Sequence, residues 1–193
     1  MKDSSDEGSG GGQDSVSLRE LSFADLSAAA DEARQLLETG YVRRGKWSLG
    51  EMCRHLRLVQ DCAIDGYPGW MSLFAPLRPI VRRMLLKRVL TGDSPIGLRT
   101  APPFVPKSDL DDAIEVGKFS ESISRLLSYE GEFRAHPGFG RLDHDRMLEL
   151  FAAHAAHHLR FLEPEKPGSE LQINAKPATD SWQASKRDIG ESS

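Results

Sequence analysis

The stretch from Asp143 to Leu162 reads DHDRMLELFAAHAAHHLRFL and predicts a single amphipathic helix. Asp143 is a good N-cap residue and Pro164 cannot continue a helix, so the helix is expected to begin after the first and stop before the second. Its apolar residues return mostly at steps of three and four, which puts them on one face turned towards the core. The members of this face are Met147, Leu150, Phe151, Phe161 and Leu162.

The same helical period occurs in three earlier segments, which are residues 23–39, 48–66 and 108–129. The first is followed by Gly40, a common C-terminal stop, and the second opens with Ser48 and Glu51 in the spacing of a capping box. Alternating apolar and polar runs bounded by turn residues are not found, so a sheet has little support. The predicted fold class is all-α, with a four-helix bundle as the simplest architecture.

A long connection, residues 67–107, separates the second of these helices from the third. It contains a short basic helix, expected over residues 80–90, and a proline-rich loop at residues 101–106. Connections of this length inside a compact domain are usually functional or cover another part of the fold. We expect this one to cap one end of the bundle.

Composition sets the limits of the folded part. Residues 1–15 are rich in Gly, Ser and Asp and are expected to form a disordered leader, because they cannot bury enough apolar surface to offset the entropy of ordering. Residues 165–193 are again polar and predict a loose C-terminal tail. One helical domain is therefore expected over residues 16–164.

The whole chain has 193 residues, a net charge of −4 and 39% hydrophobic residues. It contains neither a secretory signal pattern nor the roughly 18 uninterrupted apolar residues of a membrane span, so a soluble cytoplasmic protein is expected. The negative charge argues against a nucleic-acid coat. Cys53 and Cys62 match no zinc ribbon or redox pair, and reduced thiols are expected.

Three histidines form the candidate metal site. At about 100° per residue, His154 and His158 fall in one narrow sector of the last helix, and their i, i+4 spacing suits two ligands of a single ion. His55 lies at the border of the apolar stripe of the second helix, from which it can lean inward as a third ligand. Three ligands leave coordination positions free, as in catalytic sites. The alternative is that these are core histidines hydrogen-bonded to their neighbours.

Two further residues lie near this site in the sequence pattern. His157 is expected beside the pair or at the surface, and Cys62, seven residues after His55 on the same face, is either a thiol near the metal or an inert core cysteine. No pair of residues stands out as general acid and base, so the catalytic residues are not identified.

Several blocks of the sequence carry a family resemblance. They are RELSF at 19–23, GKWSLGEMCRHL at 45–56, DGYP at 65–68, HPGFGRL at 136–142 and HAAHHLRFL at 154–162. In order and spacing they resemble the DinB/YfiT-like superfamily, and more narrowly a branch known only as a domain of unknown function. The resemblance implies a four-helix bundle with a metal triad, which maps onto His55, His154 and His158. It also implies a metal-dependent transferase or related enzyme, in which a low-molecular-weight thiol attacks a small electrophile.

Other functions stay open at this point. The bundle could be a non-catalytic binder of a metal or small ligand. The basic helix, with Arg78, Arg82, Arg83, Lys87 and Arg88 among apolar residues, could lie on anionic lipid or nucleic acid. Arg82 and Arg83 could instead anchor the carboxylates of a thiol cofactor. Zinc, nickel and iron all suit imidazole ligands, and a homodimer is possible.

Overall fold

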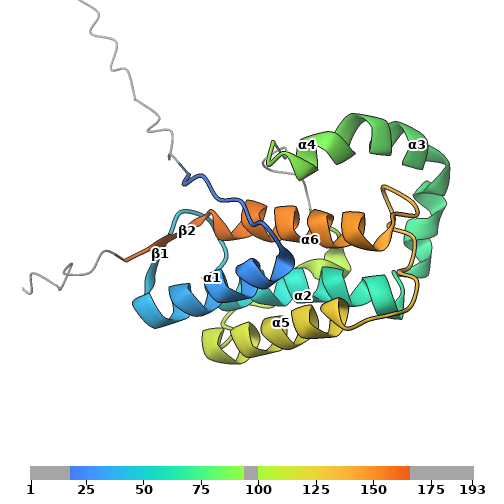
Figure 1. Ribbon diagram of the computed structural model, residues 1–193. Helices are drawn as coiled ribbons and strands as arrows, with labels where there is room; N and C mark the ends of the chain where they lie inside the picture. Colours follow the sequence, from blue (N-terminus) through green and yellow to red (C-terminus); the bar gives the residue numbers. More distant parts are fainter. Residues whose placement is uncertain (1–17, 94–99, 166–193) are drawn as a thin grey trace, which may run out of the picture.

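The computed structural model describes residues 18–93 and 100–165, and these form an all-α fold (Figure 1). The four long helices are α1 (Leu26–Thr39), α2 (Leu49–Asp65), α5 (Asp112–Leu127) and α6 (His144–Leu159). α2 packs along α5, α1 packs on α5 and α6, and α2 also contacts α6. The prediction of a helical fold is therefore confirmed.

Side-chain caps set where these helices begin. Asp25, Asp111 and Asp143 each accept a hydrogen bond from the backbone N–H three residues later, and Ser48 and Glu51 form the complete capping box that the sequence predicted. The first and third helices begin a few residues later than expected, because their caps are Asp25 and Asp111. Such caps satisfy N–H groups that otherwise lack partners.

The core consists of the inward faces of the four helices. Its largest fully buried side chains are Phe119, Phe151, Leu26, Leu36, Leu49, Leu56, Leu126, Met147 and Leu159. Burying each such side chain stabilises the fold by roughly 1.5–3 kcal/mol. This packing fixes the rotation of α2 and α6 about their axes, and with it the direction of their histidines.

A small sheet, which the sequence did not predict, closes one side of the fold. β1 (Tyr41–Arg43) follows α1 and pairs antiparallel with β2 (Leu162–Pro164), with Arg43 opposite Leu162. The last helix therefore ends at Leu159, and Leu162 is buried from a strand and not from the helix. Three-residue strands are too short to display an alternating pattern, which explains the wrong prediction.

The connection between α2 and α5 is largely helical. It comprises η1 (Gly69–Leu77), α3 (Arg78–Val81), a π-helical segment η2 (Arg82–Leu86), α4 (Lys87–Leu90) and η3 (Pro102–Phe104). The basic helix expected over residues 80–90 is thus present. It runs over α6 (Figure 1), so the connection covers a side of the fold as well as one end.

The predicted leader, residues 1–15, and all but the first residue of the predicted tail, residues 165–193, lie outside the described residues. Within the described part, no helix combines the length and the apolar character needed to cross a membrane.

Candidate metal centre

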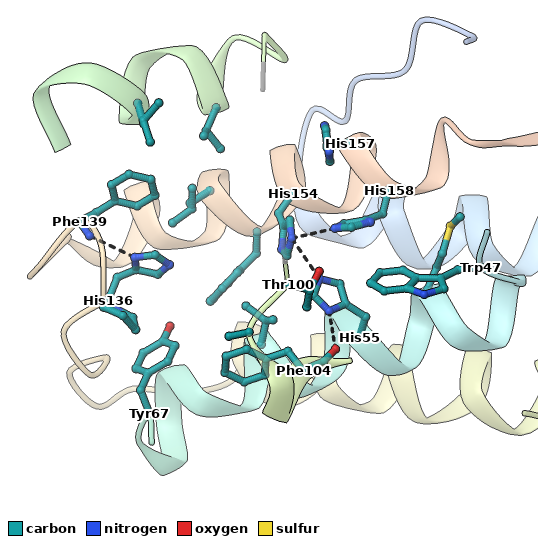
Figure 2. A pocket seen from close by; sticks show the side chains of 18 of the residues that line it. Trp47, His55, Tyr67, Thr100, Phe104, His136, Phe139, His154, His157 and His158 are labelled. Carbon is teal, nitrogen blue, oxygen red and sulfur yellow. Dashed lines mark hydrogen bonds between the residues drawn. The ribbon is translucent and has the colours of Figure 1, made fainter. Parts of the chain in front are cut away.

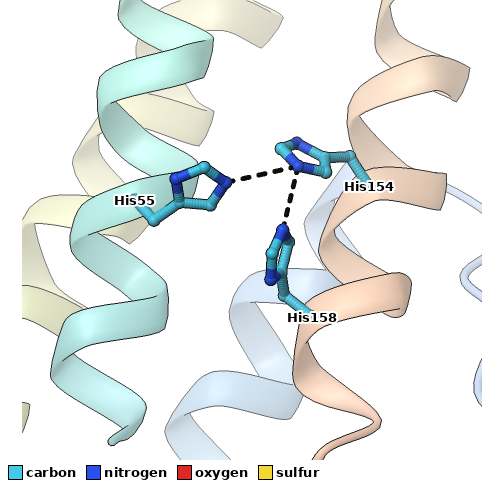
Figure 3. Close-up of side chains that lie close together, drawn as sticks. All are labelled: His55, His154 and His158. Carbon is cyan, nitrogen blue, oxygen red and sulfur yellow. Dashed lines mark hydrogen bonds between the residues drawn. The ribbon is translucent and has the colours of Figure 1, made fainter. Parts of the chain in front are cut away.

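His55 of α2 and His154 and His158 of α6 turn their imidazole rings towards one point (Figure 3). The Nε2 atom of His154 lies 3.4 Å from Nε2 of His55 and 3.1 Å from Nε2 of His158. One ring nitrogen from each residue lies within 4.8 Å of the other two. This group can hold a metal ion, since the three histidines predicted from the sequence do converge.

A hydrogen bond from His55 to the proline-rich loop fixes the tautomer of His55. Its Nδ1 lies 2.8 Å from the carbonyl oxygen of Phe104, and because a carbonyl only accepts, Nδ1 carries the proton. The Nε2 atom of His55 therefore presents a lone pair to the other two rings. A metal-ligating histidine commonly donates its second N–H in this way.

Hydrogen bonds cannot satisfy both contacts of His154. Its Nε2 carries either one proton or one lone pair, so it can pair with His55 or with His158 but not with both. A cation would accept the lone pairs of all three nitrogens. Tetrahedral zinc with bonds of about 2.0–2.1 Å separates its ligand nitrogens by roughly 3.3 Å, which is close to the two distances from His154. The three histidines could therefore hold a metal ion.

The surroundings keep these imidazoles neutral. Burial lowers the pKa of His55. Burial first and the neighbouring histidines second hold the pKa values of His154 and His158 well below the ordinary value. Neutral rings have the lone pairs that ligation requires.

The triad lies in the wall of a partly open pocket of about 610 Å³ (Figure 2). Trp47 packs against it, with its ring centroid 5.6 Å from that of His158 in a stacked arrangement and 5.0 Å from that of His55. Phe104, Phe139, Leu150 and Phe151 are among the mostly apolar residues that line the rest. Such a site suits a small molecule with an apolar body.

A comparison with known protein families identifies the family of this chain. The model of the protein family of unknown function DUF1569 matches residues 15–165. The chain belongs to this family. No curated protein and no solved structure matches the chain. The matched residues span the predicted domain, 16–164, so the three histidines lie inside the DUF1569 region.

His157 and Cys62 were expected only near the triad, and of these two His157 lines the same pocket. His157 lies beside His158, at 5.3 Å between ring centroids, and Figure 2 shows its side chain directed away from the three convergent rings. Cys62 is not among the residues that line the pocket. Burial, together with Asp61 and Asp65, raises the pKa of the Cys62 thiol, which disfavours a thiolate.

Arg82 and Arg83, the predicted anchors for a cofactor, also do not line the pocket. The Arg82 guanidinium instead donates to the backbone carbonyl oxygen of Arg141 at 2.9 Å. It therefore ties the basic helix to the loop before α6. Arg83 is exposed.

The pocket residues that were not predicted to belong to the site include Trp47, Tyr67, Phe104 and His136. Each lies in a loop or at the end of a helix, where no periodic pattern gives the direction of a side chain. The motif around His136 does stand out in the sequence, but only as part of a family resemblance.

Proposed function

We propose that this DUF1569 chain is a DinB-like four-helix metalloprotein that holds one divalent ion on His55, His154 and His158. The observation that carries the proposal is the convergence of three imidazole nitrogens, of which hydrogen bonding can satisfy only one pair. We further propose that the ion, whether zinc, nickel or iron, serves a transferase or related reaction on a small electrophile.

The ion, when bound at an open histidine site, supplies Lewis acidity that makes a water or a low-molecular-weight thiol nucleophilic near neutral pH. The chain's own contribution is positional. Phe104 orients His55 through its carbonyl group, and Trp47 covers the rings of His55 and His158. The mostly apolar lining of the partly open pocket would exclude water from a bound substrate.

Metal analysis of untagged protein tests the ligand set. We expect about one divalent ion per chain, and a loss of at least 90% of it in each of H55Q, H154Q and H158Q. The matched control is H144Q, because His144 lies on the same helix as two of the ligands but at its exposed start. Full metal content in H154Q would refute the proposal.

Turnover separates an enzyme from a non-catalytic binder. The metal-loaded protein is to be assayed with thiols and with water against a panel of small electrophiles. Product formation that disappears in H154Q supports the enzyme. Stoichiometric metal without any turnover supports a bundle that only binds a metal or a small ligand.

The connection between α2 and α5 supports a second function, association with anionic lipid. Among residues 66–92 its exposed large apolar side chains are Trp70, Leu73, Phe74, Leu77, Ile80 and Met84. Residues 66–92 contain five Lys and Arg and no Asp or Glu, although the whole chain has a net charge of −4. An exposed apolar face next to cations, on a helical segment, suits the surface of a negatively charged bilayer.

Sedimentation with vesicles tests this second function. We expect binding to vesicles with 30% phosphatidylserine, weaker binding at high salt, and a loss of at least fivefold in the double variant I80S/M84S. The matched control is I114S/L127S, which removes two exposed apolar side chains from α5. Equal vesicle binding by I80S/M84S and I114S/L127S would refute association with lipid. Retention on heparin without vesicle binding, or dimerisation through this face without vesicle binding, would also refute it.

A further inference from the structure

A second polar group lies in the same pocket as the three histidines. Tyr67, just after α2, and His136, in the loop before α6, both line the pocket, and their rings meet edge to face with centroids 5.7 Å apart. Figure 2 shows both side chains at one end of the pocket, with Trp47 at the other end and the triad between them.

The surrounding loop determines where His136 carries its proton. Its Nδ1 accepts hydrogen bonds from the backbone N–H groups of Gly138 at 3.1 Å and Phe139 at 3.2 Å. Nδ1 is therefore the lone-pair nitrogen, and in the neutral ring the proton sits on Nε2. Burial and the nearby charge of Arg78 lower the pKa of His136 to about 4, so the neutral ring is the form present near pH 7. His136 thus offers one N–H donor on its other edge.

The hydroxyl of Tyr67 is buried and has no hydrogen-bond partner among residues 18–93 and 100–165. Burial raises the pKa of this hydroxyl, so it keeps its proton. A buried hydroxyl without a partner costs roughly 1–3 kcal/mol, and native proteins usually supply a partner. Figure 2 shows it directed towards the His136 ring, so the two donors lie at the same end of the pocket.

The walls around these two donors are apolar. Met71, Leu85, Phe139, Leu150 and Phe151 line the pocket in addition to the residues around the triad. Neither donor is charged, so the pair matches a neutral acceptor better than a full anion. A carbonyl oxygen has two lone pairs and can accept from an N–H and an O–H together.

We propose that Tyr67 and His136 form a carbonyl-binding subsite, which holds the oxygen of a small ketone, ester or amide whose apolar body fills the pocket. As a binding site it stands without a metal. As the place where the substrate of the proposed enzyme is oriented, it rests on the proposed function.

The test compares two probes of nearly equal shape. They are 4-phenyl-2-butanone and 2-methyl-4-phenyl-1-butene, in which a CH₂ group replaces the carbonyl oxygen. Their dissociation constants are measured by NMR titration of the full chain, once after treatment with a chelator and once with added Zn²⁺. The chelated sample tests the carbonyl-binding subsite even if the chain binds no metal. The metal site and the carbonyl-binding subsite can therefore be refuted independently of each other.

We expect the ketone to bind the wild-type protein about tenfold more tightly than the alkene, because two hydrogen bonds are gained. Y67F removes only the hydroxyl, and H136N removes the Nε2 donor while its amide oxygen can replace Nδ1 as acceptor. Each should weaken ketone binding about three- to tenfold and leave alkene binding unchanged, which also shows that the pocket is intact. The matched control is Y129F, because Tyr129 does not line the pocket.

Three results would overturn the subsite: no ketone binding by the wild-type protein, equal affinity for ketone and alkene, or full ketone affinity in both Y67F and H136N. A downfield shift of the ¹³C carbonyl resonance of labelled ketone, lost in Y67F, would support it independently of affinity.

Discussion

The backbone carbonyl of Phe104 accepts the Nδ1 proton of His55 at 2.8 Å, and this contact decides which nitrogen of His55 faces His154. The two residues are 49 positions apart in the chain. The proline-rich loop therefore has a definite structural role, because its short helical turn at Pro102–Phe104 holds the carbonyl in place beside α2. Partners of this kind commonly change metal affinity by about 10- to 100-fold when they are lost.

Phe104→Ala is expected to weaken metal binding about tenfold, because removal of its buried ring loosens the turn that carries the carbonyl group. The measurement is a competition titration with a chromophoric chelator. The matched control is Phe133→Ala, which truncates an equally buried ring away from the triad. Both changes should lower the free energy of unfolding by about 3–5 kcal/mol. Equal metal affinity in the two variants would remove the positioning role of Phe104.

Metal should also stabilise the fold, because the three ligands join α2 to α6. At a free Zn²⁺ concentration of about 100 times Kd, the expected gain is about 2.7 kcal/mol, or a rise in Tm of roughly 5–10 °C. Thermal unfolding followed by circular dichroism measures this rise, and a chelator should reverse it. H158Q should unfold at the same temperature with and without Zn²⁺. An identical rise in that variant would mean that Zn²⁺ binds elsewhere.

The sequence was sufficient for the parts of the fold that repeat locally. A helical period and a capping residue predicted α2 and α6 closely, and the same period placed His154 and His158 on one face. His55 could be assigned inward from its place beside the apolar stripe, and it is 4% exposed. These predictions need only the geometry of one helix.

The rest depends on contacts between distant segments. β1 and β2 pair residues about 120 positions apart, and neither strand has a pattern of its own. The direction of Tyr67 and His136 follows from how two loops meet across the pocket. Cys62 lies seven residues, or about two helical turns, after His55, which keeps a similar direction on the helix but places its side chain beyond the pocket lining.

Acid should destabilise the protein partly through His136. The pKa of His136 is about 4 in the folded protein, and its ordinary value of 6.5 applies to the unfolded chain. Between pH 6.5 and pH 4 the unfolded chain therefore binds more protons than the folded protein, so the free energy of unfolding falls as the pH falls. The contribution of neutral His136 to the free energy of unfolding is complete above pH 6.5, and about 2 kcal/mol of this free energy is lost by pH 5. Urea unfolding of wild type and H136N at pH 7 and pH 5 measures it. Asn does not titrate, so the variant should lose about 2 kcal/mol less than wild type over this range. Parallel losses in the two proteins would contradict the assignment.

Two glycines in helices should respond to alanine in opposite directions. A Cβ added to Gly50 would lie 2.8 Å from Oδ1 of Asp112 and 3.2 Å from its Cα, so it cannot be accommodated by rotating one side chain. That carboxylate is also held by the Tyr41 hydroxyl at 2.6 Å and by the Gly50 N–H at 2.7 Å. Gly50→Ala should therefore lower the free energy of unfolding by about 1–3 kcal/mol.

A Cβ added to Gly117, in the middle of α5, would meet no atom within 4 Å. Because glycine is a poor helix former, Gly117→Ala should raise the free energy of unfolding by about 1 kcal/mol. Urea denaturation of both variants at pH 7 measures the two effects on one scale. If Gly50→Ala were as stable as Gly117→Ala, the starts of α2 and α5 would not approach each other as closely as described. The hydrogen bonds of Asp112 with Tyr41 and Gly50, which hold the first turn of α2, would then need revision.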